Sequence, residues 1–211
     1  MKIILASGSP RRLELLRQMG WDVEVHSLPF PESETVNEAT EKADRLRNKK
    51  DVVLLSSYRD ADLVCAYNAL GKGRAAAKVT GTGIPVVAAD TIVVLGGQIL
   101  GKPSDAADAK RVLHLLSGKT HVVKTATVVL YQEKSFLQVV TTSVRFRNLT
   151  EEEIDWYVGT GEPLDKAGAY GIQGKGAVLV ERIGGSYDNV VGLPVAVVYE
   201  MLVKLGVQIK K

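Results

Sequence analysis

The chain has 211 residues, 45% of them hydrophobic and 24% charged, which is typical of a globular protein with one substantial core or two small lobes. A formal net charge of +3 suits an anionic small molecule and falls short of the concentrated basic surface expected for nucleic-acid binding. The single cysteine excludes an intramolecular disulfide framework, and the few histidines argue against a structural zinc site. No apolar run is long enough for a membrane span or a signal peptide, so we expect a cytoplasmic protein without a membrane partner.

The N-terminal stretch KIILASGSPRRLELL, residues 2–16, predicts a buried strand, a glycine turn and the start of a helix. Ser9 and Pro10 supply an N-cap and a first-turn proline. Arg11 and Arg12 follow, where cations oppose the helix dipole at a cost of roughly a few tenths of a kcal/mol each. A phosphate ligand explains both arginines, and the alternative is two solvated side chains on a surface helix.

The next part of the chain predicts a strand and two helices. Alternating apolar and polar residues at 21–26 are typical of a half-exposed strand. Thr35 and Glu38 have the spacing of a capping box, which opens a charged, exposed helix that we expect to run through Lys50. The alanine-rich stretch 60–78 predicts a second helix despite its two glycines, and a loop follows.

The apolar run at 86–95 predicts a buried strand that contains one carboxylate, Asp90. Burying a carboxylate requires compensation by a metal, a cation or hydrogen bonds, and functional sites tolerate that cost. Asp90 is therefore a candidate functional residue, with a satisfied core aspartate as the alternative. Gly96 and Gly97 predict a tight turn into a short strand at 98–100.

A helix and a hairpin are expected next. Apolar residues at helical spacing predict a helix from a Ser104 cap to Gly118. Two β-rich runs, 121–131 and 136–146, predict the hairpin. We interpret His121, at the start of the first of these strands, as a structural residue rather than a general base.

The C-terminal third contains a glycine-rich segment at 162–176, after a short helix opened by a capping-box pattern at Thr150 and Glu153. We favour a binding loop over a flexible linker, because the segment carries functional side chains rather than serine-rich filler: Asp165, Lys166, Tyr170 and Gln173. The remaining elements are expected to be a strand at 177–183, a loop at 184–194 and a helix over 198–205.

The chemical inventory indicates phosphate-ester chemistry. Lys72 and Lys102 supply cations next to glycines, while Glu32 and Asp90 supply carboxylates. Cations and Mg²⁺ can screen phosphate charges, and a carboxylate can bind the metal or take a proton from water. Because Walker A, GxSxG, HExxH and strand-linked GxGxxG patterns are absent, the commonest motor-NTPase, serine-hydrolase, zincin and Rossmann classes are excluded.

The chain resembles the Maf-like (septum-formation-inhibitor) nucleoside triphosphate pyrophosphatases through six motifs in family order. These are ASGSPRR at 6–12, AADTIV at 88–93, GKP at 101–103, LSGKTH at 116–121, TGEPLDKAGAYGIQG at 160–174 and NVVGLP at 189–194. The resemblance implies a single Maf-like domain over residues 1–211. Its expected fold is α/β and two-lobed with a mixed β-sheet, similar to inosine-triphosphate pyrophosphatases, with the substrate cleft between the lobes.

The resemblance also implies a reaction. A nucleoside triphosphate is hydrolysed between its α and β phosphates to the monophosphate and pyrophosphate, with Mg²⁺, or alternatively Mn²⁺, as cofactor. Such enzymes are regarded as house-cleaning enzymes of nucleotide metabolism, some are linked to arrest of cell division, and many form homodimers. The ADT and GIQG motifs resemble the branch that acts on dTTP, UTP and modified pyrimidine nucleotides rather than the branch that acts on 7-methyl-GTP.

Individual roles carry over by motif. Asp90 matches the proton acceptor and a metal ligand, and Glu32 matches a metal-side carboxylate. The phosphate-side positions are Ser9, Arg11, Arg12, Lys72 and Lys102. The positions linked to base specificity are Arg11, Thr91 and Gln173. Chemistry agrees for Gln173, because its amide can donate to O4 and accept from N3–H of uracil or thymine, and cytosine reverses that pattern.

The sequence departs from the family at three places. Pro31 stands where an aspartate is usual before Glu32-Ser33, which leaves Glu34 as the alternative carboxylate. Lys72 is followed by glycine rather than alanine, and the segment 36–70 is longer than usual, without a function that the sequence indicates. Two alternatives stay open: a regulatory nucleotide- or partner-binding protein of cell division without turnover, and a purine pyrophosphatase acting on inosine or xanthosine triphosphate.

Overall fold

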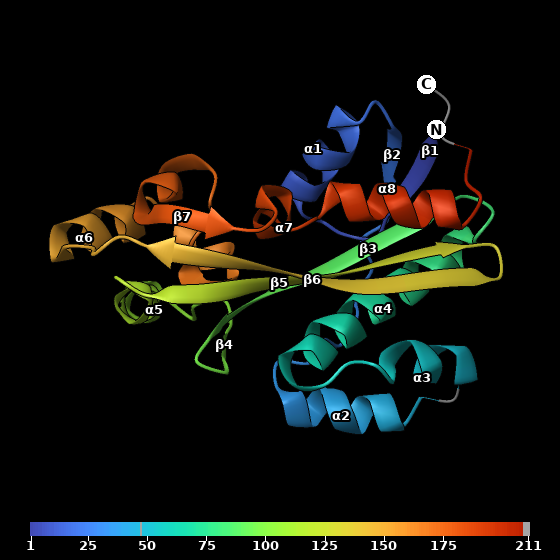
Figure 1. Cartoon of the computed structure of the whole chain (residues 1–211), viewed down its shortest axis with the longest axis horizontal. Helices are drawn as coiled ribbons and strands as arrows, with labels where there is room; N and C mark the ends of the chain where they lie inside the picture. Colours follow the sequence, from blue (N-terminus) through green and yellow to red (C-terminus); the bar gives the residue numbers. More distant parts are fainter. Residues whose placement is uncertain (47, 209–211) are drawn as a thin grey trace. The chain divides into compact units, whose positions relative to one another are not determined.

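The computed structural model describes residues 1–46 and 48–208, which form an α/β fold (Figure 1). The strands are β1 (Lys2–Leu5), β2 (Asp22–Val25), β3 (Val86–Leu95), β4 (Gln98–Leu100), β5 (Thr120–Tyr131), β6 (Lys134–Phe146) and β7 (Val180–Gly184). The α-helices are α1 (Pro10–Gln18), α2 (Val36–Asp44), α3 (Lys49–Leu55), α4 (Asp60–Thr80), α5 (Ala106–Leu116), α6 (Glu151–Gly159), α7 (Tyr187–Val191) and α8 (Val195–Lys204). The short 3₁₀ helices are η1 (Glu162–Asp165), η2 (Ala167–Ala169) and η3 (Gly174–Leu179).

The sheet is mixed, as the sequence predicts. Its order is β2-β1-β3-β5-β6-β7, and β4 pairs with β3. β1 runs parallel to β2 and β3, whereas β4 and β7 run antiparallel to their partners. The chain divides into two compact units. The first comprises Met1–Asp90, Thr125–Val140 and the described residues from Gly192, and the second comprises Thr91–Lys124 and Thr141–Val191.

In the first unit, helices cover both faces of the strands. Val87 and Ala89 of β3 share a core with residues of α1 and α8, whereas α4 lies against the opposite face (Figure 1). The approach of α4 is close, because a Cβ at Gly73 would lie 3.0 Å from Val128 Cγ1 and 3.4 Å from Ala88 Cβ. A glycine inside this helix therefore serves packing, and its cost in helix propensity, about 1 kcal/mol, is offset by that contact.

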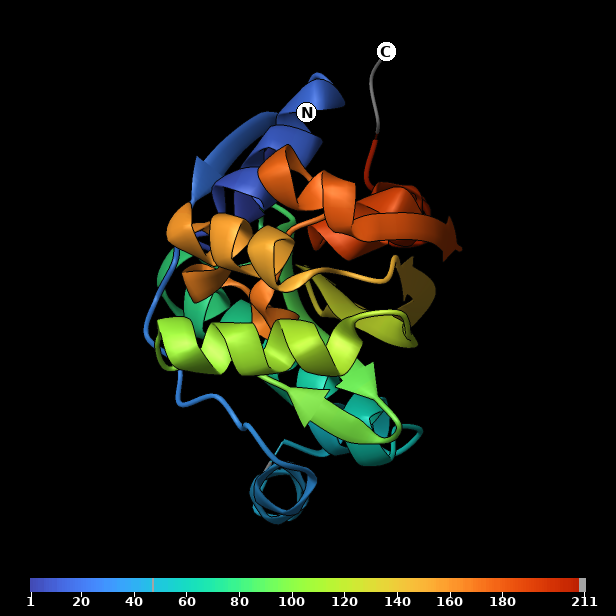
Figure 2. The ribbon, with the colours of Figure 1, turned by 90° about the vertical axis from the view of Figure 1, so that its left-hand side faces the viewer.

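In the second unit, α5 and α6 pack side by side (Figure 2). The predicted stripe of Ala109, Val112, Leu113 and Leu116 on α5 is buried in the core of this unit. The capping box that opens α6 is complete, since Thr150 and Glu153 each accept a hydrogen bond from the other residue's backbone. Among the described residues, no helix combines the length and apolar character needed to cross a membrane.

Two predictions for the helical segment that begins at Thr35 need correction. The charged helix expected through Lys50 is two helices, because Asn48 caps a new helix by accepting from the backbone N–H of Lys50. Thr35 caps α2 as predicted, but the Glu38 carboxylate accepts from Glu34 rather than from Thr35, so the capping box is only half formed.

Three further predictions were wrong in detail. The N-cap of α5 is Asp105 rather than Ser104, since the Asp105 carboxylate accepts from Asp108. The strand expected at 177–183 begins three residues later, because 174–179 forms a 3₁₀ helix whose first N–H groups bind the Glu162 carboxylate. The loop expected at 184–194 contains α7, whose start is capped by the Ser186 hydroxyl.

Candidate active site

The first unit brings together three of the predicted site residues. Asp90 lies on β3, and its side chain is only 9% exposed. Lys72 on α4 places Nζ 2.7 Å from Asp90 Oδ1 and 3.0 Å from Glu32 Oε2. The ammonium group thus offsets the desolvation cost of the buried carboxylate and links it to a second, half-exposed one.

Asn68 completes this cluster, and the sequence reasoning missed it. Its Nδ2 donates to Asp90 Oδ2 at 3.2 Å and to the Ser33 carbonyl at 2.9 Å, while its Oδ1 accepts from the Ser33 N–H at 2.8 Å. Asn68 therefore joins Asp90 to the segment that carries Glu32. The available signal was its position four residues before Lys72, on the same face of α4.

The Ser33 hydroxyl is a buried polar group beside this cluster whose hydrogen bonding is incomplete. Ser33 is 3% exposed, and among the described residues its Oγ has no hydrogen-bond partner. An unpaired buried hydroxyl costs about 1–3 kcal/mol, so a bound ligand or water at this position would be stabilised.

Lys72 pairs with Glu32, which favours Glu32 over Glu34 as the functional carboxylate.

Arg12 forms hydrogen bonds around the β1–α1 turn that stabilise its backbone. Its Nε donates to the Gly192 carbonyl at 2.8 Å, and its Nη1 donates to Ser7 Oγ at 2.9 Å and to the Ala89 carbonyl at 2.8 Å. Burial lowers the pKa of the Arg12 guanidinium, and the charge of Asp90 opposes that shift. Arg12 therefore anchors the helix N-terminus that the sequence assigns to phosphate binding.

The other predicted phosphate-side residues of the first unit lie at that helix start. Ser9 is the N-cap of α1, although its side chain makes no capping hydrogen bond. Arg11 is half-buried in the first turn, next to Arg12. The first turn of α1 contains no acidic residue that would favour the positive end of the helix dipole, so the turn is suited to an anion.

Thr91, Lys102 and Gln173 belong to the second unit. Thr91 is half-buried on β3, and Lys102 is exposed in the turn between β4 and α5. Gln173 is half-buried between η2 and η3. Within residues 1–46 and 48–208, neither the Lys102 ammonium nor the Gln173 side-chain amide forms a hydrogen bond or an ion pair with another residue. Both groups are therefore able to meet a ligand.

His121 has the structural role that the sequence suggested. It is 1% exposed, its Nε2 lies 2.8 Å from the Tyr170 hydroxyl, and its ring packs edge-on against Phe146 and Tyr170. Burial lowers the pKa of His121 to about 4. The imidazole is therefore neutral at physiological pH and acts as part of the core.

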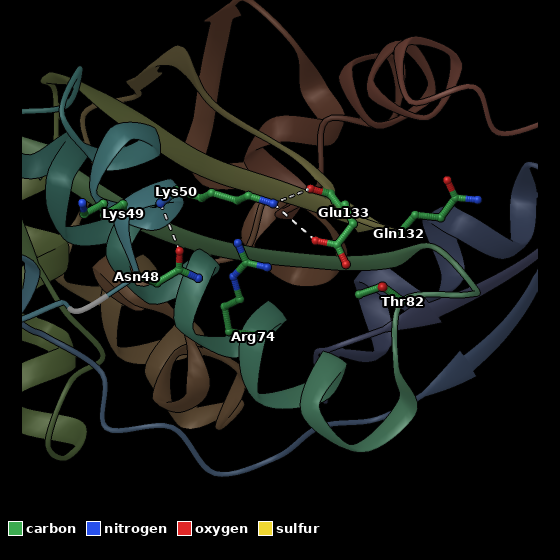
Figure 3. Close-up of a pocket in the computed structure, with 7 residues that line it drawn as sticks. All are labelled: Asn48, Lys49, Lys50, Arg74, Thr82, Gln132 and Glu133. Atoms are coloured by element: carbon green, nitrogen blue, oxygen red, sulfur yellow. Dashed lines mark hydrogen bonds and ion pairs between the residues drawn. The ribbon is translucent and has the colours of Figure 1, made fainter.

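A polar cavity of about 360 Å³ lies elsewhere in the first unit (Figure 3). It is lined by Asn48, Lys49, Lys50, Arg74, Thr82, Gln132 and Glu133, and none of the predicted site residues is among them. Lys50 Nζ lies 3.3 Å from Glu133 Oε2, and Arg74 donates to the buried Asp51 through Nε and Nη2. This cavity is therefore separate from the cluster of Glu32, Lys72 and Asp90.

The donor set fits a divalent metal that binds together with a nucleotide. Among the described residues, no group of three or more His, Cys, Asp or Glu side chains could hold a metal ion. Mg²⁺, however, is commonly held by one or two carboxylates together with substrate phosphates and water. Glu32 and Asp90 already share one cation, the Lys72 ammonium, so their oxygens can meet at a single positive centre.

Comparisons with known proteins show which family the chain belongs to. The model of the family described as "Maf-like protein" matches residues 2–205. A dTTP/UTP pyrophosphatase of Bacillus cytotoxicus is 48% identical over 196 residues, which cover 92% of this chain and 91% of that protein. Proteins of the same name from Agathobacter rectalis and Dictyoglomus thermophilum are 43% and 42% identical, covering 99% and 97% of this chain and 99% and 96% of their own lengths.

One solved structure, the Ham1 protein of Staphylococcus aureus, matches 69% of this chain and 72% of its own at 15% identity. Its TM-score of 0.42 is too low for this likeness to carry any conclusion. The family match, by contrast, spans residues 2–205, which is nearly the whole chain. The chain therefore belongs to the Maf-like protein family.

Proposed function

We propose that this protein hydrolyses nucleoside triphosphates, with dTTP and UTP as preferred substrates, to the monophosphate and pyrophosphate. The observation that carries the proposal is the cluster of Glu32, Lys72 and Asp90, in which one ammonium joins a buried and a half-exposed carboxylate. Relatives named dTTP/UTP pyrophosphatase, 42% to 48% identical over nearly the whole chain, support the substrate class.

In this proposal Asp90 takes the proton from the attacking water, since it is the carboxylate that Lys72 and Asn68 hold in a fixed orientation. Lys72 also supplies positive charge where the phosphates lose their solvent. Glu32 and Asp90 would hold the divalent cation, which screens the phosphate oxygens when bound. The unpaired Ser33 hydroxyl is an additional donor for a ligand oxygen.

The triphosphate binds at the N-terminus of α1 in this proposal. Ser9 and Arg11 contact the phosphates there, and Arg12 keeps the turn in place through hydrogen bonds to Ser7, Ala89 and Gly192. Lys102 provides a further cation for the phosphates. We assign base recognition to Gln173, with Arg11 and Thr91 as supporting positions.

Mg²⁺ is the proposed cofactor, and Mn²⁺ is the alternative, because both take oxygen ligands from carboxylates and phosphates. A house-cleaning role in nucleotide metabolism follows from the proposed reaction, which removes nucleotides from the triphosphate pool. The homodimer and the cytoplasmic location stay predictions from the sequence.

The test is release of pyrophosphate, measured against orthophosphate, from a panel of nucleoside triphosphates with and without Mg²⁺. Metal-dependent pyrophosphate release led by UTP and dTTP is expected. Asp90→Asn should abolish it, whereas Asp155→Asn, which alters an exposed aspartate of α6, should not. A purine preference would retain the reaction and reject the base assignment. Tight nucleotide binding without turnover would instead favour the regulatory binding protein.

A further inference from the structure

We propose that Tyr157 and Glu162 are positioning residues that hold Gln173 in place for reading the base. This inference rests on the proposed function, in which the Gln173 amide contacts the base. It assigns a specificity role to two side chains that the motif-based reasoning left without one. Both residues and the loop that they bind lie in the second unit.

The hydrogen bonds of this pair bracket Gln173 on both sides. The Tyr157 hydroxyl accepts from the Gly171 N–H at 3.1 Å and donates to Glu162 Oε1 at 3.1 Å. The Glu162 carboxylate accepts from the Lys175 N–H at 3.2 Å and from the Gly176 N–H at 3.3 Å. One connected pair of side chains therefore binds the backbone two residues before Gln173 and two and three residues after it.

The loop between these anchors is closed on itself. A Cβ at Gly176 would lie 2.2 Å from the Gly171 carbonyl oxygen and 2.7 Å from the Tyr157 hydroxyl, so only glycine fits there. Gly174 has φ +64°, and a Cβ there would lie 3.1 Å from Glu162 Oε2. Gln173 is thus in the middle of a ring of six residues whose two ends meet at the Tyr157–Glu162 pair.

The Tyr157 side chain is part of the hydrophobic core of the second unit. Tyr157 is fully buried, and burial raises the pKa of its hydroxyl, which keeps the proton that binds Glu162. Among the described residues, no other side chain binds the Gln173 amide, so its place is set through the loop backbone. Recognition of uracil requires the amide to reach both O4 and N3–H at hydrogen-bond distance, so discrimination depends on where the loop backbone places Gln173.

The experiment measures kcat and KM for UTP and CTP in Tyr157→Phe, Glu162→Gln and Gln173→Ala, at saturating Mg²⁺. We expect all three variants to lower the ratio of kcat/KM for UTP to that for CTP by about tenfold, mainly through KM for UTP. Glu162→Asp, which keeps both carboxylate oxygens, should restore part of that ratio. Tyr187→Phe and Glu152→Gln change exposed residues and serve as matched controls.

The outcomes separate this proposal from the proposed function. If Tyr157→Phe and Glu162→Gln reduce activity on UTP and CTP equally while Gln173→Ala lowers the ratio, the pair is only structural and the positioning role is refuted. If Gln173→Ala leaves the ratio unchanged, the base assignment and the positioning role both fail, although triphosphate hydrolysis stands. Hydrogen exchange adds a readout independent of turnover: Glu162→Gln should speed exchange of the 171–176 amides, and unchanged protection would contradict the proposal.

Discussion

The burial of His121 predicts that stability falls in mildly acidic solution. The imidazole packs against the rings of Tyr170 and Phe146, and burial lowers the pKa of His121 to about 4, from an ordinary value of 6.5. Because burial also raises the pKa of Tyr170, that hydroxyl stays neutral throughout the acidic range. Within residues 1–46 and 48–208, no hydrogen bond or ion pair joins the imidazole to a charged group that could stabilise its protonated form.

The difference between the pKa of His121 in the folded and in the unfolded chain sets the direction and the magnitude of the change in unfolding free energy. Between pH 6.5 and pH 4 the imidazole binds a proton in the unfolded chain but not in the folded chain. The unfolding free energy is therefore highest above pH 6.5 and decreases as the pH is lowered through this range. Lowering the pH from 8 to 5 should cost about 2 kcal/mol of unfolding free energy. With a urea slope of about 2 kcal/mol/M, the unfolding midpoint should fall by about 1 M.

The assay is urea unfolding followed by circular dichroism at pH 8 and pH 5. Glu24 contributes little to the change in stability between pH 8 and pH 5. Contacts with His26 and Lys2 lower the pKa of Glu24 to about 2, so the stability that this carboxylate contributes is lost only below about pH 4.5. His121→Phe combined with Tyr170→Phe removes both polar partners and should flatten the pH dependence. His114→Asn, in an exposed position, should leave it intact. A double variant with the full midpoint shift would refute the reasoning.

Three other perturbations test packing and the site. Asp51→Asn breaks the ion pair between the buried Asp51 and the partly exposed Arg74 and should cost about 1–3 kcal/mol by thermal unfolding. Gly73→Ala should cost about 1–3 kcal/mol and lower kcat, because its Cβ would push α4 from the sheet, whereas Gly83→Ala, in open space, should change neither. Asn68→Leu leaves the Ser33 backbone unpaired, so UTP hydrolysis should fall at least tenfold and unfolding free energy by about 2 kcal/mol.

Local patterns predicted the fold well wherever local chemistry decides it. The stripe on α5, the capping box of α6 and the glycine turn after β3 depend on residues close in sequence, and the structure confirms all three. Asp90 was recognisable for a similar reason, because one carboxylate inside an apolar strand requires compensation that a sequence can reveal. The identity of that compensation was partly visible, since Lys72 was expected near the phosphates but not on Asp90 itself.

The predictions that were wrong or missing depend on contacts between residues that are distant in the sequence. The sequence predicts a strand at 177–183, yet residues 177–179 belong to η3, because Glu162, more than ten residues earlier, binds the N–H groups at the start of that 3₁₀ helix. Asn68 is an unfavourable residue in an alanine-rich helix, and its value depends on Ser33 and Asp90, which are distant in sequence. A single sequence contains no direct record of such pairings.

In the proposed reaction, charge balance at this cluster favours a metal that binds together with the nucleotide. Glu32 and Asp90 carry two negative charges, and Lys72 compensates one of them. Arg12, whose guanidinium interacts electrostatically with Asp90 and Glu32, adds a second positive charge near them. The protein alone therefore offers little net attraction for a divalent cation, in line with the absence of a three-ligand cluster among the described residues. A triphosphate adds the missing negative charge and oxygen ligands, so metal and nucleotide binding should be coupled.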